Sequence, residues 1–201
     1  MKKHTFSLLA IATVVLCSSF IFLREAAAPV YKVDSAKSTL KWTGKKVTGE
    51  HTGTIKISTG TLTVDKNVIT AGSFDIDLTT ITSTDVTDPS TNAKLIGHLK
   101  ADDFFSVAKF PKATFVITSV KSKGKDLYDV TGNLTIKGIT NPVAFPATIK
   151  AEAGKVTATA TILVDRTKYD IKFRSASFFS DLGDKAIDND FALDLNLVAT
   201  K

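Results

Sequence analysis

The sequence has few of the residues that build covalent cross-links or metal centres. Its 201 residues include one cysteine, Cys17, one tryptophan and three histidines. Cys17 lies in an N-terminal apolar run, so the domain that follows has no thiol and needs no disulfide, which suits a periplasm-like compartment. With His51 and His98 as the only histidines of that domain, we expect no metal site.

Arginine is also scarce, and familiar catalytic motifs are missing. After the N-terminal segment only Arg166 and Arg174 remain, and the net charge of +6 is spread thinly, without a basic helix. This distribution argues against nucleic-acid binding. No Gly-x-Ser-x-Gly elbow, phosphate loop or dinucleotide fingerprint occurs, so the sequence predicts no catalytic residue, no catalytic cofactor and no enzyme.

The N-terminal segment has the composition of an export signal. A basic start, Met1 to His4, precedes an apolar run over residues 6–23 and small residues at 26–28. Three fates stay open: cleavage after Ala28, retention as a membrane anchor by a run just long enough to span a bilayer, and lipidation at Cys17. We expect residues 1–28 to be a signal peptide or N-terminal membrane segment. We expect residues 29–201 to form the domain of a periplasmic or secreted protein, whose membrane association would come through that segment.

The domain alternates apolar and polar residues with a period of two. Residues 72–79 place Phe74, Ile76 and Leu78 on one face, and residues 190–197 repeat the pattern. Such alternation is typical of antiparallel strands with one dry face, and many such strands must pair with a second sheet or close on themselves. We expect an all-β fold with strands near 31–34, 38–48, 51–58, 61–65, 68–80, 113–121, 127–137, 142–152, 155–164 and 190–199, with a turn at 58–60.

One segment, 85–112, departs from the strand pattern. Leu95, Ile96 and Leu99 follow helical spacing after the capping residues around Asp88. We expect a short helical excursion that covers one end of the sheet structure. His98 on this segment is predicted to anchor the helix to the barrel.

Several stretches together resemble the YceI-like family. They are His51-Thr-Gly53, Gly97 to Phe105 with Phe110-Pro111, Gly132 to Gly138, and Asp165 to Tyr169, in that family's order. The resemblance runs from about Tyr31 to Leu197. It implies a lipocalin-like antiparallel β-barrel of about eight strands, whose elongated apolar cavity holds a polyisoprenoid or similar long amphiphile. It further implies an exported protein without established catalytic activity, with an isoprenoid-type lipid or quinone as the bound molecule.

Small residues on the inward face favour a hollow barrel. Gly53, Gly132, Ala158 and Ala160 share the inward parity and remove volume from an interior that is near the size needed for one ligand. The alternative is that they only relieve crowding. The candidate cavity residues are Trp42, Ile55, Phe74, Ile76, Leu78, Phe104, Phe105, Phe115, Ile117, Gly132, Leu134, Ile136, Phe145, Ala158, Ala160 and Ile162.

Two polar residues are candidates for the head group of such a ligand. His51 has inward parity at a strand start, and Arg166 follows a strand end with a guanidinium suited to phosphate or carboxylate. The alternatives are that a loop carbonyl near Gly49 satisfies His51 and that Arg166 fixes a turn.

The sequence thus predicts an exported lipid-binding protein that sequesters or carries a polyisoprenoid or similar long-chain amphiphile. The alternative is a non-catalytic envelope interaction or stress-response module with a packed core and no lipid. A homodimer is compatible with both hypotheses, the lipid-binding protein and the lipid-free module.

Overall fold

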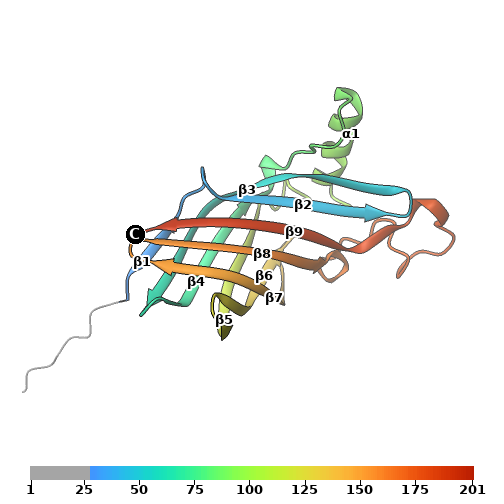
Figure 1. The fold of residues 1–201 in the computed structure, drawn as a ribbon. Coiled ribbons are helices and arrows are strands. Elements are labelled where there is room, and N and C mark those ends of the chain that lie inside the picture. The colour runs from blue at the N-terminus through green and yellow to red at the C-terminus, as the bar shows by residue number, and fades with distance from the viewer. Residues whose placement is uncertain (1–27) are drawn as a thin grey trace, which may run out of the picture.

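Eight antiparallel strands close into a barrel, in the computed structural model that describes residues 28–201 (Figure 1). Each strand pairs with the next along the chain, and the β2–β9 pairing completes the ring. This arrangement confirms the predicted all-β, lipocalin-like fold. The strands are β2 (Thr39–Lys46), β3 (Gly49–Asp65), β4 (Val68–Asp77), β5 (Lys112–Gly124), β6 (Leu127–Ile136), β7 (Ile139–Glu152), β8 (Lys155–Asp165) and β9 (Ile187–Thr200). The predicted leader, residues 1–28, lies outside the described residues except for its last position.

A ninth strand, β1 (Val30–Val33), occupies the same place in the ring of strands as β2, between β3 and β9. It pairs with residues 61–63 of β3 and residues 199–200 of β9, whereas β2 lies between the same two strands farther along. A turn at residues 34–38 separates the two strands. In this turn the Asp34 carboxylate accepts hydrogen bonds from the backbone N–H groups of Ala36 and Lys37 at 3.1 and 3.2 Å.

Strand β3 corrects one prediction. The expected turn at 58–60 is wrong, because β3 runs unbroken through it and instead has an irregular register against β4 between Ile57 and Thr59. Such a β-bulge uses the same small residues as a turn. At Gly60 a Cβ would lie 2.7 Å from side-chain atoms of both Phe74 and Val33, so glycine lets these side chains approach the bulge.

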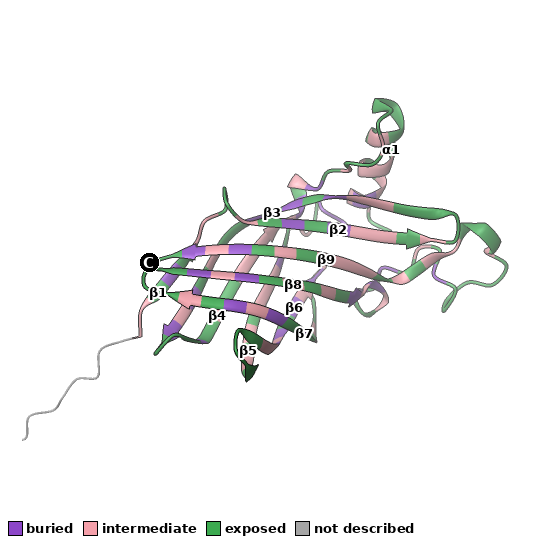
Figure 2. Cartoon of the chain, viewed as in Figure 1, coloured by how far each residue is buried: buried purple, intermediate pink, exposed green. Residues whose placement is uncertain are grey.

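Buried and exposed residues alternate along the strands, as the sequence predicts (Figure 2). At the end of the barrel near β1 the interior is fully packed. Leu62, Val64, Val156 and Ala199 are all at most 3% exposed there. This end of the barrel is therefore closed by its own core.

The predicted helical excursion is confirmed as helix α1 (Pro89–Lys100), which projects from the opposite end (Figure 1). The Asp88 carboxylate caps it by accepting the Thr91 N–H at 2.8 Å, and a proline follows at the first helical position. Short 3-10 turns η1 (Leu78–Thr80), η2 (Arg166–Tyr169) and η3 (Gly183–Lys185) complete the same end. Between residues 28 and 201, no helix is long and apolar enough to cross a membrane.

Candidate functional site

The barrel interior holds an apolar cavity in two halves. The first half lies toward the packed end and contains about 810 Å³ of atom-free space, solvent at its openings included. The second half lies toward α1 and contains about 790 Å³ on the same measure. Leu40, Ile76, Leu134 and Leu193 line both halves, so the two meet at a waist formed by these four side chains.

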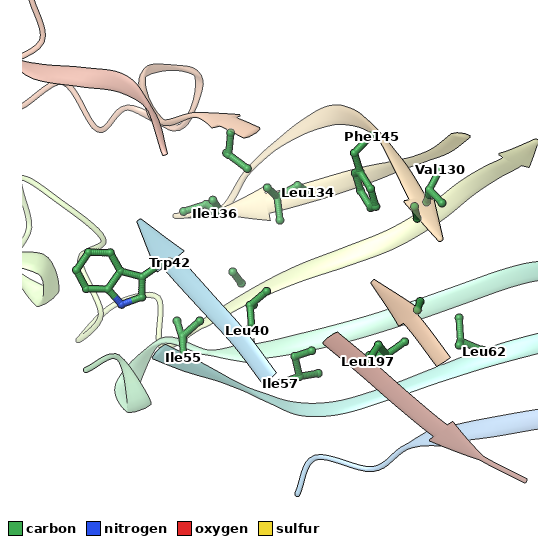
Figure 3. Packing of buried hydrophobic residues seen from close by; sticks show 14 of the residues in the cluster. Leu40, Trp42, Ile55, Ile57, Leu62, Val130, Leu134, Ile136, Phe145 and Leu197 are labelled. Carbon is green, nitrogen blue, oxygen red and sulfur yellow. The ribbon is translucent and has the colours of Figure 1, made fainter. Parts of the chain in front are cut away.

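The cavity is elongated along the barrel. On β6 it extends from Val130 in the first half to Ile136 in the second, which is six residues or roughly 20 Å of strand. Figure 3 shows side chains from several strands, among them Leu40 and Ile57, directed into this interior. A long, narrow and apolar space of this kind can take up an extended hydrocarbon chain.

All but two of the predicted cavity residues line this space. In the first half these are Phe74, Ile76, Phe115, Ile117, Leu134, Phe145, Ala158 and Ile162, and in the second Trp42, Ile55, Ile76, Leu78, Phe104, Phe105, Leu134 and Ile136. Gly132 and Ala160 line neither half.

The two exceptions have different causes. Gly132 is buried, but a Cβ there would overlap the ring of Phe115, so the missing side chain makes room for a neighbour and not for a hollow. Gly53 behaves likewise, because the Thr82 carbonyl occupies its space. At these two positions the interpretation of glycine as a source of cavity volume is wrong, and relief of crowding is right. Ala160 is half-buried and lines a hollow on the outside of the barrel.

One wall of the cavity, formed by β9, is absent from the predicted set of cavity residues. Leu193, Leu195 and Leu197 of β9 line the first half, and Phe191 and Leu193 line the second. Their period-two alternation was a sufficient signal, since it places all four on one face. Other lining residues absent from the predicted set include Leu40, Ile57, Leu62, Ile69, Ile81, Leu99, Ala113, Val130, Val143, Ala147 and Ile149.

Arg166 is the charged residue buried at the cavity, and it is only 2% exposed. Its Nε, Nη1 and Nη2 groups donate to the backbone carbonyls of Asp188, Ile171 and Ile187 at 2.9, 2.7 and 3.0 Å. The guanidinium carbon lies 5.9 Å from the centre of the Phe104 ring. Arg166 therefore ties η2 to the start of β9, which is the turn-fixing role that the sequence also allowed.

The guanidinium keeps some capacity for a ligand. It carries five N–H donors, and three of them serve these carbonyls, which leaves two. Among residues 28–201, no carboxylate forms an ion pair with it. Burial lowers its pKa while the Asp165 and Asp188 charges raise it, with a net lowering, yet an arginine stays charged at neutral pH.

His51 lies outside both halves of the cavity. Its Nδ1 lies 2.7 Å from Oδ2 of Asp85, whose other oxygen accepts the Thr52 N–H at 3.0 Å. Burial raises the pKa of the Asp85 carboxyl, but hydrogen bonds from Thr52, His51 and Ser83 outweigh it and lower that pKa to about 2. His51 thus joins the loop after β4 to β3, and its partner is a carboxylate and not the loop carbonyl that the alternative expected.

His98 anchors helix α1 as predicted, but its partner is the segment after η2 and not a barrel strand. Its ring packs edge-on against Phe173, with 4.4 Å between ring centres, and against Phe104 at 5.7 Å. Its Nε2 lies 3.1 Å from the Asp103 carboxylate. Helix α1 is held in this way to the segment that follows η2. Within the described part of the chain, no group of three or more potential ligands could hold a metal ion.

Comparison with protein families and curated sequences finds one family. Residues 31–199 match the model of the YceI-like domain. A UPF0312 protein of Pseudomonas putida strain W619 is 35% identical over 155 residues, which is 76% of each chain. Protein YceI of Salmonella arizonae is 40% identical over 100 residues, or 50% of this chain and 49% of the relative.

Solved structures share the fold. BcnA of Burkholderia cenocepacia superposes with a TM-score of 0.67 at 24% identity, covering 84% of this chain and 99% of the other. A polyisoprenoid binding domain from Saccharophagus degradans, implicated in plant cell wall breakdown, superposes with a TM-score of 0.62 at 16% identity, covering 87% and 99%.

Proposed function

This chain belongs to the YceI-like family, and on that premise we propose that it binds a polyisoprenoid or similar long-chain amphiphile inside its barrel, as a carrier or store. The observation that carries the proposal is the elongated cavity, whose two apolar halves meet at the waist of Leu40, Ile76, Leu134 and Leu193. The polyisoprenoid binding named for the Saccharophagus degradans structure supports the same ligand class.

Binding would rest on burial of the hydrocarbon chain. Each methylene withdrawn from water contributes roughly 0.8 kcal/mol, so a long chain binds tightly without strong polar contacts. Phe104, Phe105 and Trp42 in the second half add aromatic surface against which such a chain packs.

We place the polar head of the ligand at the α1 end of the cavity, beside Arg166. Burying an unpaired polar group costs roughly 1–3 kcal/mol, so the head belongs where donors remain. The two N–H groups that Arg166 does not use for carbonyls suit a phosphate, carboxylate or quinone oxygen. Asp188 and Asp190, exposed at the same end, favour a head group of low negative charge.

The head-group role is tested by replacing Arg166 with lysine. The lysine ammonium would keep a charge at this position but could not donate to three carbonyls and a head group together. We expect R166K to weaken a prenyl ligand with a phosphate or quinone head at least fivefold more than a plain hydrocarbon of equal length. Equal weakening of both ligands would make Arg166 a residue of the scaffold alone.

The proposal as a whole is tested by native mass spectrometry and by an organic extract of the full chain purified without detergent. We expect a long-chain prenyl lipid or quinone near one molecule per barrel. A protein that carries no lipid and takes up no prenyl probe would favour the lipid-free interaction module instead.

We further propose that the protein is exported, with residues 1–28 as its signal or membrane segment. The basic start and the apolar run of the sequence support this proposal. Cell fractionation with N-terminal sequencing of the mature chain tests it: a start near Pro29 is expected, and a cytoplasmic chain beginning at Met1 would contradict it.

A further inference from the structure

The barrel wall is incomplete between β7 and β8. These strands are paired only where residues 148–152 face residues 155–159. Beyond that point β7 stays paired with β6 back to Ile139, and β8 stays paired with β9 up to Asp165. In this register residues 142–147 of β7 and 160–165 of β8 thus face each other without a ladder, and we call this opening the seam.

Two prolines explain why the ladder stops. In an antiparallel strand, successive N–H groups point to opposite neighbours. The Ile149 N–H donates to the Asp126 carbonyl on the β6 side, at 2.8 Å, and the β6–β7 register has no bulge. Odd-numbered residues of β7 therefore direct their N–H toward β6 and even-numbered ones toward β8. Pro142 and Pro146 are even-numbered and have no N–H, so two donors toward β8 are missing.

The seam leads to the cavity. A hollow on the outer surface lies at the end of the seam next to the Thr148–Thr159 pair, and Ala147 and Leu195 line both this hollow and the first half of the cavity. The seam is bounded at one end by the Thr148–Thr159 pair and at the other by Asn141, whose Nδ2 donates to the Lys168 carbonyl at 2.9 Å. Asn141 and Thr148 are seven positions apart on β7, or roughly 23 Å of strand.

The borders of the seam carry small and apolar side chains beside four polar ones, Thr148, Thr159, Thr161 and Asp194. Ala160 lines the hollow, and Leu127, also in its lining, is 53% exposed. Leu163 on the outward face of β8 is 64% exposed, where a strand facing water usually carries a polar residue. A hydrocarbon chain can contact these side chains before it enters the interior of the barrel.

We propose that the seam is a lateral portal through which the apolar chain of a lipid enters and leaves the barrel; this inference rests on the proposed function. Passage at the β1 end would require the packed Leu62, Val156 and Ala199 to move. At the α1 end, Arg166 holds η2 and β9 together through three hydrogen bonds. At the seam no ladder pairing holds the two strands together.

Closing the seam with a cross-link tests this route. Extending the β7–β8 register puts Ala144 opposite Leu163, and both are exposed. In the full chain with Cys17→Ser, A144C and L163C are joined by a short bis-maleimide. Uptake of a prenyl quinone is followed by stopped-flow quenching of Trp42, which is the only tryptophan and lines the cavity. We expect uptake and release both to slow at least tenfold, with little change in Kd.

The matched control keeps one of the two positions. L163C with A192C places the same cross-link across the continuous β8–β9 ladder, where these residues face each other. The control should exchange ligand at the rate of the unlinked protein. Equal rates for the two cross-linked proteins would overturn the portal, since the chain would then pass through an end. No quenching in the unlinked protein would instead mean that the proposed function fails for prenyl quinones.

The two prolines give an independent test. P142V with P146V restores both N–H groups, and A144V between them adds the same side chain without adding a donor. We expect the double variant to show slow hydrogen exchange at residues 142 and 146 and to take up the quinone more slowly than A144V. Slow exchange with unchanged uptake would overturn the portal, and fast exchange would overturn the role assigned to the prolines.

Discussion

The backbone carbonyl of Thr82 lies so close to Gly53 that any Cβ at position 53 would overlap it. The same carbonyl accepts a hydrogen bond from Nε1 of Trp42 at 2.9 Å. Thr82 also pairs with β3, because its N–H donates to the Thr54 carbonyl at 2.9 Å. Glycine at 53 therefore lets the chain after η1 run close alongside β3 and bring the neighbouring Ile81 to the cavity.

This contact predicts the effect of Gly53→Ala. The methyl group meets backbone atoms, which cannot move aside as a flexible side chain can, so the variant should lower the free energy of unfolding by about 1–3 kcal/mol. Urea denaturation measures the change. Gly44→Ala on the paired strand is the control, since nothing lies within 4 Å of a Cβ there. Equal stability of the two variants would contradict the contact.

Asp85 predicts a fall in stability at acidic pH. Burial raises the pKa of its carboxyl, but hydrogen bonds from Thr52, His51 and Ser83 outweigh it, and the folded-state pKa is about 2 against 3.8 in the unfolded chain. Because the folded pKa is lowered, the contribution is present above pH 4 and is lost as the pH falls toward 2. A shift of this size corresponds to at most about 2 kcal/mol, and because Asp85 is exposed, solvent screening reduces the contribution below that figure.

Asp85→Asn should remove this contribution. Urea denaturation between pH 6 and pH 2 should find the variant less stable than the wild type at pH 6, with the two converging as the pH approaches 2. Ser83→Ala removes one hydrogen bond to the same carboxylate, at 3.0 Å, and should lie between them. A constant difference between wild type and Asp85→Asn over the whole range would refute the assignment.

The waist of the cavity predicts a dependence on chain length. Leu193 is half-buried and lines both halves, so Leu193→Phe should narrow their junction. We expect a prenyl ligand long enough to need both halves to bind at least tenfold more weakly, and a short prenyl ligand to bind nearly as before. Titration with quenching of Trp42 measures both affinities.

The control for Leu193→Phe is a substitution by phenylalanine on the outside of the barrel. Val116 is 45% exposed on β5, and Val116→Phe should alter neither affinity. Equal losses for the long and the short ligand in Leu193→Phe would mean that one half binds alone.

Helix α1 is predicted to become more ordered when ligand binds. Leu99 near its C-terminus lines the second half, and the adjacent Lys100 ammonium donates to the Thr79 carbonyl at 2.8 Å. Contact of the ligand with Leu99 should slow hydrogen exchange in the last turn of the helix. Identical exchange with and without a prenyl quinone would make α1 a fixed cap.

Much of the site could be predicted because strand periodicity records which face each side chain occupies. Phe74, Ile76 and Ile136 line the cavity for that reason alone, and the Asp88 cap marked the start of α1 in the same local way. The failed turn at 58–60 has a local cause too, since turns and bulges use the same residues.

The partners of His51, Gly132 and Arg166 could not be predicted in this manner. Strand parity predicted that His51 faces the interior, but its imidazole instead contacts Asp85 in the loop after η1. Phe115 filled the space beside Gly132 from the neighbouring strand.

The sequence by itself determined the strands, their inward faces and the helix, because these depend on residues a few positions apart. Only the tertiary structure decided which side chains fill the interior, where Arg166 donates its hydrogen bonds and where the wall stays open. Those outcomes depend on the register between strands and on closure of the ring. Pro142 and Pro146 show the difference: the residues are visible in the sequence, but only the pairing with β6 reveals that their missing N–H groups face β8.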